Sequence, residues 1–185
     1  YTQFDTLSLH DALPIFRPDL LRRGVEAYGQ VRENLSRHAP GYPEARDLLA
    51  RIKAGSKEFG MAGVGEGKST EGSRHIVEAV DRPDPRPLWI AVWGGANTLA
   101  QALWDVKYSR SPEELEKFVS RLRVYTISDQ DNSGRWLRIT FPGLLYTVSP
   151  SSVDSKEYYL ATWTGISGDR HYRNGPMQDF ELVDN

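Results

Sequence analysis

The sequence predicts an α/β fold in which a mostly parallel, open sheet is flanked by helices and is incomplete at both ends. Three observations predict it. Residues 88–93 are apolar at every position, which is typical of a strand in a parallel sheet covered on both faces. Segments with apolar residues three and four positions apart lie before and after this run. Strand, loop, helix and strand then alternate, which implies right-handed crossovers and a sheet with helices on its faces.

Length and composition fit one soluble domain. The chain has 185 residues, 39% of them hydrophobic and 26% charged. A net charge of −2 predicts no general affinity for nucleic acid or acidic lipid. The absence of cysteine excludes disulfides, thiolate metal sites and cysteine nucleophiles. No apolar run approaches the ~18 residues of a membrane-spanning helix, so we expect neither nucleic acid nor a membrane as a partner.

Both ends of the chain look cut. Residues 8–15 resemble a translated adapter sequence, so we set residues 1–15 aside as a non-native segment and assign residues 16–185 to one partial domain. A real disordered N-terminal arm is the alternative. Residues 180–185 stop without any decline in apolar content, and we therefore expect a fragment of a larger protein.

The first half of the chain is predicted to be helical, with one glycine-rich loop. Pro18 suits the first turn of a helix, and Gly55 can end a second amphipathic segment. Ser73 can cap a third helix. The expected elements, in order, are a helix over residues 18–38, a helix over 45–52, a loop over 56–72 and a helix over 73–80.

The second half is predicted to contain the sheet. Ser111 and Glu114, with a proline between them, form a capping box that opens a helix whose buried face includes Leu122. The expected elements, in order, are a strand over residues 88–93, a turn over 94–97, a helix over 98–108, a helix over 111–122, a strand over 124–128, a polar turn over 129–134, a strand over 144–148 and a short strand within 158–163.

The two polar turns mark the expected ligand site. In open α/β sheets, ligands bind beyond the carboxyl ends of the strands. Turns 94–97 and 129–134 each follow a predicted strand, so we expect them to lie side by side at one rim and to form half of a pocket for an ion and a sugar. Trp93 and Trp136 border these turns and are candidates to stack on a sugar ring, whereas tryptophan in an apolar segment is more often part of a core.

Several familiar motifs fail on spacing. Residues 63–69 look like a phosphate-binding loop, but Ala62 stands where its first glycine belongs and no buried strand precedes it. The turn at 129–134 matches the first half of a calcium loop, but Thr140 stands where a glutamate is required. The four histidines have no ligand spacing, and the serine-hydrolase elbow is absent. The acidic turn therefore either satisfies its own backbone or supplies a functional carboxylate pair.

Longer motifs resemble a known family. From about residue 17 to residue 185, the chain resembles a bacterial nucleoside-hydrolase-like family, some of whose members are described as cellulose-binding proteins. The motifs that carry the resemblance are AYGQVR at 27–32, VGEGK at 64–68, RPLW at 86–89, VWGGANTLAQAL at 92–103, RVYTISDQD at 123–131 and ATWTGISGD at 161–169.

The resemblance implies a calcium site. The family looks related to the calcium-dependent ribonucleoside hydrolases, in which one Ca²⁺ at the strand ends activates water. The turn at residues 94–100 is similar to the G-P-L-T-N-L-A turn of those enzymes, which implies that the backbone carbonyl of Asn97 is a metal ligand. The main aspartate ligands of the relatives have no counterpart in this sequence, so we expect this chain by itself to be inactive.

The resemblance also implies a substrate pocket. Glu66 and Lys68 lie where the relatives carry a pocket loop, and Asp129 and Asp131 follow a neighbouring strand. The full set of candidate substrate-binding residues is Glu66, Lys68, Trp93, Asn97, Asp129, Asp131 and Trp136.

Two functions follow from the resemblance. The first is hydrolysis of N-glycosyl or related glycosidic bonds with Ca²⁺-activated water. The alternative is a carbohydrate-binding protein, such as one for cellulose, that keeps the fold without the chemistry. Either implies a nucleoside or saccharide ligand, and the family resemblance implies export to the periplasm or the cell exterior.

Overall fold

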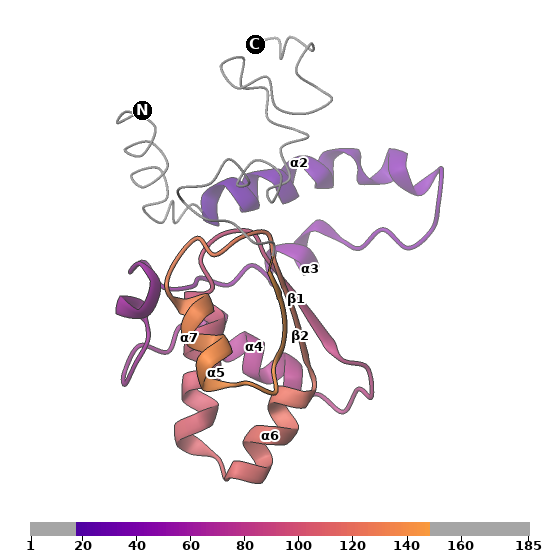
Figure 1. Ribbon diagram of the computed structural model, residues 1–185. Coiled ribbons are helices and arrows are strands. Elements are labelled where there is room, and N and C mark those ends of the chain that lie inside the picture. Colours follow the sequence, from indigo (N-terminus) through magenta and orange to yellow (C-terminus); the bar gives the residue numbers. More distant parts are fainter. Residues whose placement is uncertain (1–17, 149–185) are drawn as a thin grey trace, which may run out of the picture.

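A computed structural model of the chain describes residues 18–148 (Figure 1). The segment set aside at 1–15 and the strand expected within 158–163 lie outside these residues. The helices are α2 (Pro18–Ser36), α3 (Ala45–Leu49), the short 3₁₀ helix η1 (Gly60–Gly63), α4 (Glu71–Asp81), α5 (Asn97–Ser109), α6 (Pro112–Ser120) and α7 (Ser133–Thr140). The strands are β1 (Leu88–Val92), β2 (Leu122–Thr126) and β3 (Leu145–Val148).

The three strands form one parallel sheet in the order β1-β2-β3. Leu88 pairs with Leu122, and Arg123 pairs with Leu145. Helices α5 and α6 connect the first two strands, and α7 connects the second and third. Figure 1 shows α4, α5 and α7 on one side of the strands. The α/β class with a parallel, open sheet and flanking helices is thus confirmed.

The position of β1 differs from the prediction. Within residues 18–148, β1 is an edge strand with one face open. Trp89 on that face is 66% exposed, whereas Val92 packs in the core. An apolar outer face gives such a strand the same sequence pattern as a strand covered on both sides. The pattern therefore cannot distinguish an open face from a covered one.

Helix capping follows the expected chemistry with one shift. Ser111 and Glu114 form the predicted capping box of α6, with proline in its first turn. The cap of α4 is Thr70 rather than Ser73, because Ser73 sits three residues inside and completes a reciprocal capping box with Thr70. Leu122 belongs to β2 and not to the helix before it, and it is fully buried there.

One helix is shorter than predicted, and another was not predicted. Helix α3 ends at Leu49, before the expected stop at Gly55. Helix α7 occupies a stretch predicted to be a turn and a connection. It has only 8 residues, with Gly134 in its first turn, which is shorter than the window over which apolar periodicity identifies a helix.

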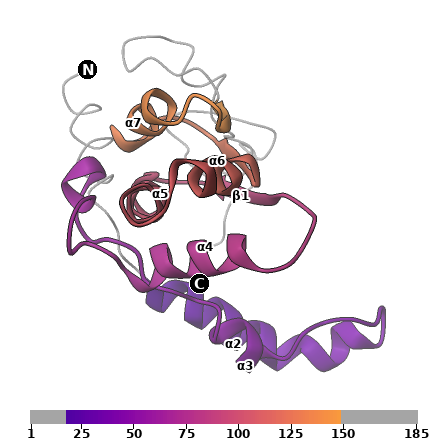
Figure 2. The same cartoon turned by 90° about the horizontal axis from the view of Figure 1, so that it is seen from below.

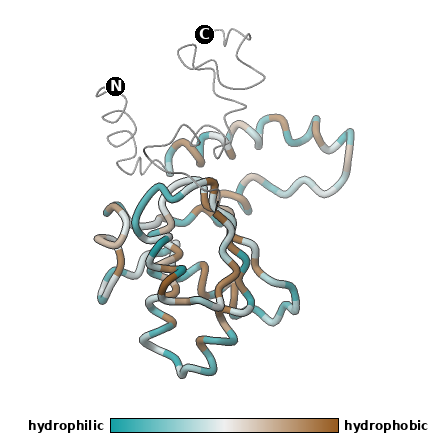
Figure 3. Tube along the Cα trace, viewed as in Figure 1, coloured by the Kyte–Doolittle hydropathy of each residue, from teal (hydrophilic) through white to brown (hydrophobic). Residues whose placement is uncertain are grey.

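The core lies between the sheet and the helices on its covered face. Leu103 of α5, Leu122 and Val124 of β2 and Leu137 of α7 are all fully buried. Helix α5 lies between α4 and α7, as Figure 2 shows from below. Figure 3 shows hydrophobic segments gathered along the strands and these inner helices. None of the helices in residues 18–148 is long and apolar enough to cross a bilayer.

Helix α2 lies outside this core. None of its residues is buried, and it packs mainly on α3. The Tyr28 hydroxyl donates to the Pro43 carbonyl at 2.6 Å, and the Arg32 guanidinium binds the Glu44 carboxylate at 2.8 Å. Gly29 allows close approach, because a Cβ there would lie 2.9 Å from the Cβ of Ala45. The helix is therefore held by polar contacts with the segment that follows it.

Candidate functional site

The two polar bends lie side by side at the carboxyl ends of the strands, as predicted. The amide of Ile127 donates to the Val92 carbonyl at 3.2 Å, and the Gln130 side chain donates to the Trp93 carbonyl at 3.0 Å. Gly95 is in contact with the carboxylate of Asp131, which occupies the space of a Cβ at that position. The bends after β1 and β2 thus form one continuous surface, which we call the rim (residues 93–97 and 128–132).

Asp131 organises the start of α7. Its Oδ1 accepts a hydrogen bond from the Ser133 amide at 2.8 Å and another from the Ser133 hydroxyl. The next residue, Asn132, accepts from the Met61 amide at 2.9 Å and so links the rim to the glycine-rich loop. Of the two interpretations of this acidic turn, the structure supports local satisfaction of the backbone for Asp131.

Asp129 forms an ion pair with the side chain of Arg138. The Arg138 guanidinium donates two parallel hydrogen bonds to its carboxylate, at 2.8 and 2.6 Å. The carboxylate raises the pKa of Arg138, whose guanidinium also lies 5.2 Å from the centre of the Tyr146 ring. Burial raises the pKa of the Tyr146 hydroxyl to about 12, and the charge of Asp129 adds to the rise. The charge of Asp129 is thus compensated within the protein.

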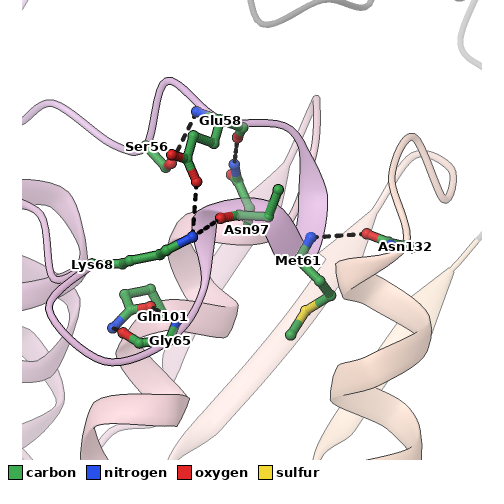
Figure 4. A network of polar contacts seen from close by, with 9 residues as sticks. Ser56, Glu58, Met61, Gly65, Lys68, Asn97, Gln101 and Asn132 are labelled. Atoms are coloured by element: carbon green, nitrogen blue, oxygen red, sulfur yellow. Dashed lines mark hydrogen bonds and ion pairs between the residues drawn. The ribbon is translucent and has the colours of Figure 1, made fainter.

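Asn97 and Lys68 hold the glycine-rich loop in place (Figure 4). Asn97 is the first residue of α5, and its side-chain amide donates to the Glu58 carbonyl at 2.7 Å. The Lys68 ammonium pairs with the Glu58 carboxylate at 3.0 Å and donates to the Ala62 carbonyl. Both predicted site residues therefore have structural roles: Asn97 joins the loop to α5, and Lys68 joins two parts of the loop to each other.

Gln101 is a site residue that the sequence analysis missed. Its fully buried side chain accepts from the Gly65 amide at 2.7 Å and donates to the Gly65 carbonyl at 3.0 Å. It also donates to the Asp105 carboxylate at 2.7 Å. The available signal was a glutamine between apolar residues of a predicted buried helix, where a polar side chain needs specific partners.

Ser128 is the second residue that was missed. It lies in the rim, is 1% exposed, and within residues 18–148 its Oγ is the one buried side-chain polar atom without a hydrogen-bond partner. A buried hydroxyl without a partner costs stability, roughly 1–3 kcal/mol. Unpartnered polar groups of this kind deserve a functional explanation, and nothing in the sequence pattern distinguishes Ser128 from other serines.

The remaining predicted residues separate in space. Trp93 lies in the rim and is 60% exposed. Trp136 is half-buried on α7, where it packs edge-on against Phe141 at 5.5 Å between ring centres and lies against the core. Glu66 is exposed and lines a cavity with residues of α4 and α5 rather than with the two bends.

The residues of the rim do not by themselves fit a Ca²⁺ ion. Calcium takes six to eight oxygen ligands, usually with several carboxylates. Within residues 18–148, no group of three or more acidic or histidine side chains is placed to hold a metal. Asp129 is bound to Arg138, and one oxygen of Asp131 is bound to Ser133. The carbonyl of Asn97 and the other oxygen of Asp131 are too few for this ion.

A parallel, open sheet with polar turns gathered at the carboxyl ends of its strands defines an open α/β protein of the kind that binds ligands at its strand ends. More particularly, the chain belongs to the family described as "Cellulose-binding Sde182, nucleoside hydrolase-like domain", whose sequence model matches residues 7–185. The resemblance seen in the motifs is thereby confirmed.

One solved structure is similar along most of the chain. It is a nucleoside hydrolase-related hypothetical protein from Saccharophagus degradans that is associated with carbohydrate metabolism. The two share 46% identity with a TM-score of 0.66, over 74% of this chain and 34% of that one. This chain thus spans about a third of the length of that protein. No curated protein matches the chain.

Proposed function

We propose that the chain binds a saccharide at the rim, as the ligand-binding part of an exported, carbohydrate-related protein. The observation that carries the proposal is the direct contact between the two bends: the Gln130 side chain donates to the Trp93 carbonyl, Gly95 contacts the carboxylate of Asp131, and Trp93 is 60% exposed. An exposed aromatic residue on a surface that also carries polar side chains suits a sugar, whose ring has an apolar face and a border of hydroxyls.

The relatives of the chain also support this proposal. The family description names cellulose, and the similar protein from Saccharophagus degradans is associated with carbohydrate metabolism. A nucleoside also carries a sugar ring and would use the same contacts.

The test is calorimetric titration of the full chain with cellohexaose and, separately, with a ribonucleoside. We expect binding of at least one ligand and a loss of about fivefold in affinity in Trp93→Ala, since a stacked ring contributes about 1 kcal/mol. Trp89→Ala is the matched control, because Trp89 is similarly exposed (66% against 60%) but lies outside the rim. Equal affinities in both variants and the parent chain would place the ligand elsewhere.

Hydrolysis of an N-glycosyl or glycosidic bond with calcium is the second candidate. It is favoured by the contact of a carboxylate, Asp131, with the turn that leads to Asn97. Calcium would supply activation of water, and the Asn97 carbonyl is the proposed ligand from this region. The described residues do not complete such a site, so no reaction step is derived from them.

The second candidate has its own assay. A longer protein of this family that carries this region together with the calcium aspartates is incubated with ribonucleosides and cello-oligosaccharides, with Ca²⁺ or with a chelator, and free base and reducing sugar are measured. Product that disappears with the chelator supports calcium-dependent hydrolysis. Ligand binding without product under either condition contradicts it and leaves the binding function in place.

A further inference from the structure

A second surface has the shape of a ligand site. A cavity of about 1020 Å³ lies between α4, α5 and the glycine-rich loop. Its lining includes Glu66 of the loop, Arg74 and Glu78 of α4, and Trp104, Asp105 and Tyr108 of α5. The volume reaches the upper end of the range of small-molecule pockets, roughly 300–1,000 Å³, so the groove can take more than one sugar unit.

Two aromatic rings form one side of this groove. Trp104 and Tyr108 lie one helical turn apart on α5, with ring centres 4.5 Å apart and planes inclined by 39°. Trp104 is partly buried against the core, whereas Tyr108 is 66% exposed. The Lys107 ammonium lies 5.9 Å from the centre of the Tyr108 ring. The exposed Tyr108 ring beside the cavity provides apolar contact area that the fold leaves open to solvent.

The groove is held together by polar contacts between the loop and the two helices. Gln101 binds both backbone groups of Gly65 and also the carboxylate of Asp105. The Ser69 hydroxyl donates to the same carboxylate, at 2.8 Å to one oxygen. The Arg74 guanidinium donates to the Ser69 carbonyl at 3.2 Å. The loop is thereby held against α4 and α5 before any ligand arrives, which reduces the cost of ordering it on binding.

The charges of the groove narrow the class of ligand. The groove is lined by three carboxylates, those of Glu66, Glu78 and Asp105, and by one guanidinium, that of Arg74. This excess of negative charge disfavours nucleotides, uronates and other anions. Carboxylates and guanidinium groups hydrogen-bond readily to neutral hydroxyls, and the aromatic pair suits the apolar faces of sugar rings.

We propose that the groove between α4 and α5 binds a neutral β-1,4-glucan chain, with Tyr108 and Trp104 stacking on its rings and Glu66 and Glu78 accepting from its hydroxyls. This inference rests on the proposed saccharide-binding function and adds a second contact surface to the rim. A ligand that reaches both surfaces would gain affinity without any stronger single contact.

The test compares groove and rim variants of the full chain in titrations with cellohexaose and in depletion by regenerated cellulose. We expect Tyr108→Ala to weaken binding about tenfold and Glu78→Gln to weaken it severalfold. Tyr108 is exposed, so its removal leaves the fold intact. Tyr125→Ala is the matched control, because Tyr125 is exposed on the open face of the sheet.

The tryptophans give an independent readout. Binding in the groove should change the fluorescence of Trp104 and binding at the rim that of Trp93, so Trp104→Phe removes the groove's share of the change on adding cellohexaose and Trp89→Phe removes none. If cellohexaose binds and Tyr108→Ala matches the parent chain while Trp93→Ala loses affinity, the groove proposal is overturned and the rim proposal stands. If the parent chain binds no saccharide, the proposed function itself fails.

Discussion

Gly95 shows how one missing side chain allows the rim to form. The carboxylate of Asp131 occupies the space that a Cβ at Gly95 would need, whereas a Cβ at Gly94 would meet nothing within 4 Å. We expect Gly95→Ala to lower the free energy of unfolding by about 1–3 kcal/mol through this overlap. Gly94→Ala should change it little or raise it slightly, since alanine restricts the unfolded chain. Urea unfolding of both variants tests this, and equal stabilities would contradict the contact.

Tyr146 gives a pH-dependent prediction. Because burial raises its pKa to about 12 in the folded chain, against about 10 in an unfolded one, the folded protein retains this proton while the unfolded chain loses it. The free energy of unfolding should therefore fall as the pH rises from about 10 to 12. Urea unfolding at alkaline pH should show a weaker decline in Tyr146→Phe. The same change at exposed Tyr125 should leave the decline as it is in the parent chain.

At the scale of elements, Gln101 joins the glycine-rich loop to α5. Gln101→Leu would leave the Gly65 amide and carbonyl without their partner, and we expect a loss of about 2 kcal/mol in the free energy of unfolding. Amide exchange at Gly65 should become faster, since the loop loses its main contact with α5. Gln30→Leu on the exposed surface of α2 is the control. Slow exchange at Gly65 in Gln101→Leu would show that other contacts hold the loop.

The same elements show what the sequence could and could not predict. The strand and turn positions predicted the rim, because parallel strands end at one edge and carry their next residues to the same place. The partners of Asp129 and Asp131 could not be predicted, since Arg138 and Ser133 belong to a helix of only 8 residues that the sequence analysis took for a turn and a connection. Glu66 was grouped with the rim because a motif says nothing of which surface its side chain lines.

At the scale of the whole molecule, ion pairs of aspartate with arginine set the response to acid. The guanidinium of Arg110 lowers the pKa of Asp81, and that of Arg86 lowers the pKa of Asp84. Folding is therefore favoured by these carboxylates above their unfolded pKa of about 4, and that contribution is lost as the pH falls below it. The free energy of unfolding should decrease through this range.

The acid response can be assigned with one pair of variants. Asp81→Asn should be less stable than the parent chain at neutral pH and should lose less stability on acidification, as measured by urea unfolding at several pH values. Asp47→Asn is the control, because its carboxylate makes only a 3.8 Å contact with neighbouring Arg46. Parallel pH profiles for Asp81→Asn and the parent chain would exclude the Arg110 pair as a source of acid sensitivity.

The consecutive order of the strands has a consequence for kinetics. Each strand pairs with the strand that comes next along the chain, and each crossover lies between partners. Leu88 pairs with Leu122 and Arg123 with Leu145, so each pairing must first close a whole crossover, a step that makes parallel sheets slow to form. A nascent chain leaving the ribosome can join its second strand to its first as soon as α5 and α6 have emerged, and the third strand can then dock onto a surface already formed.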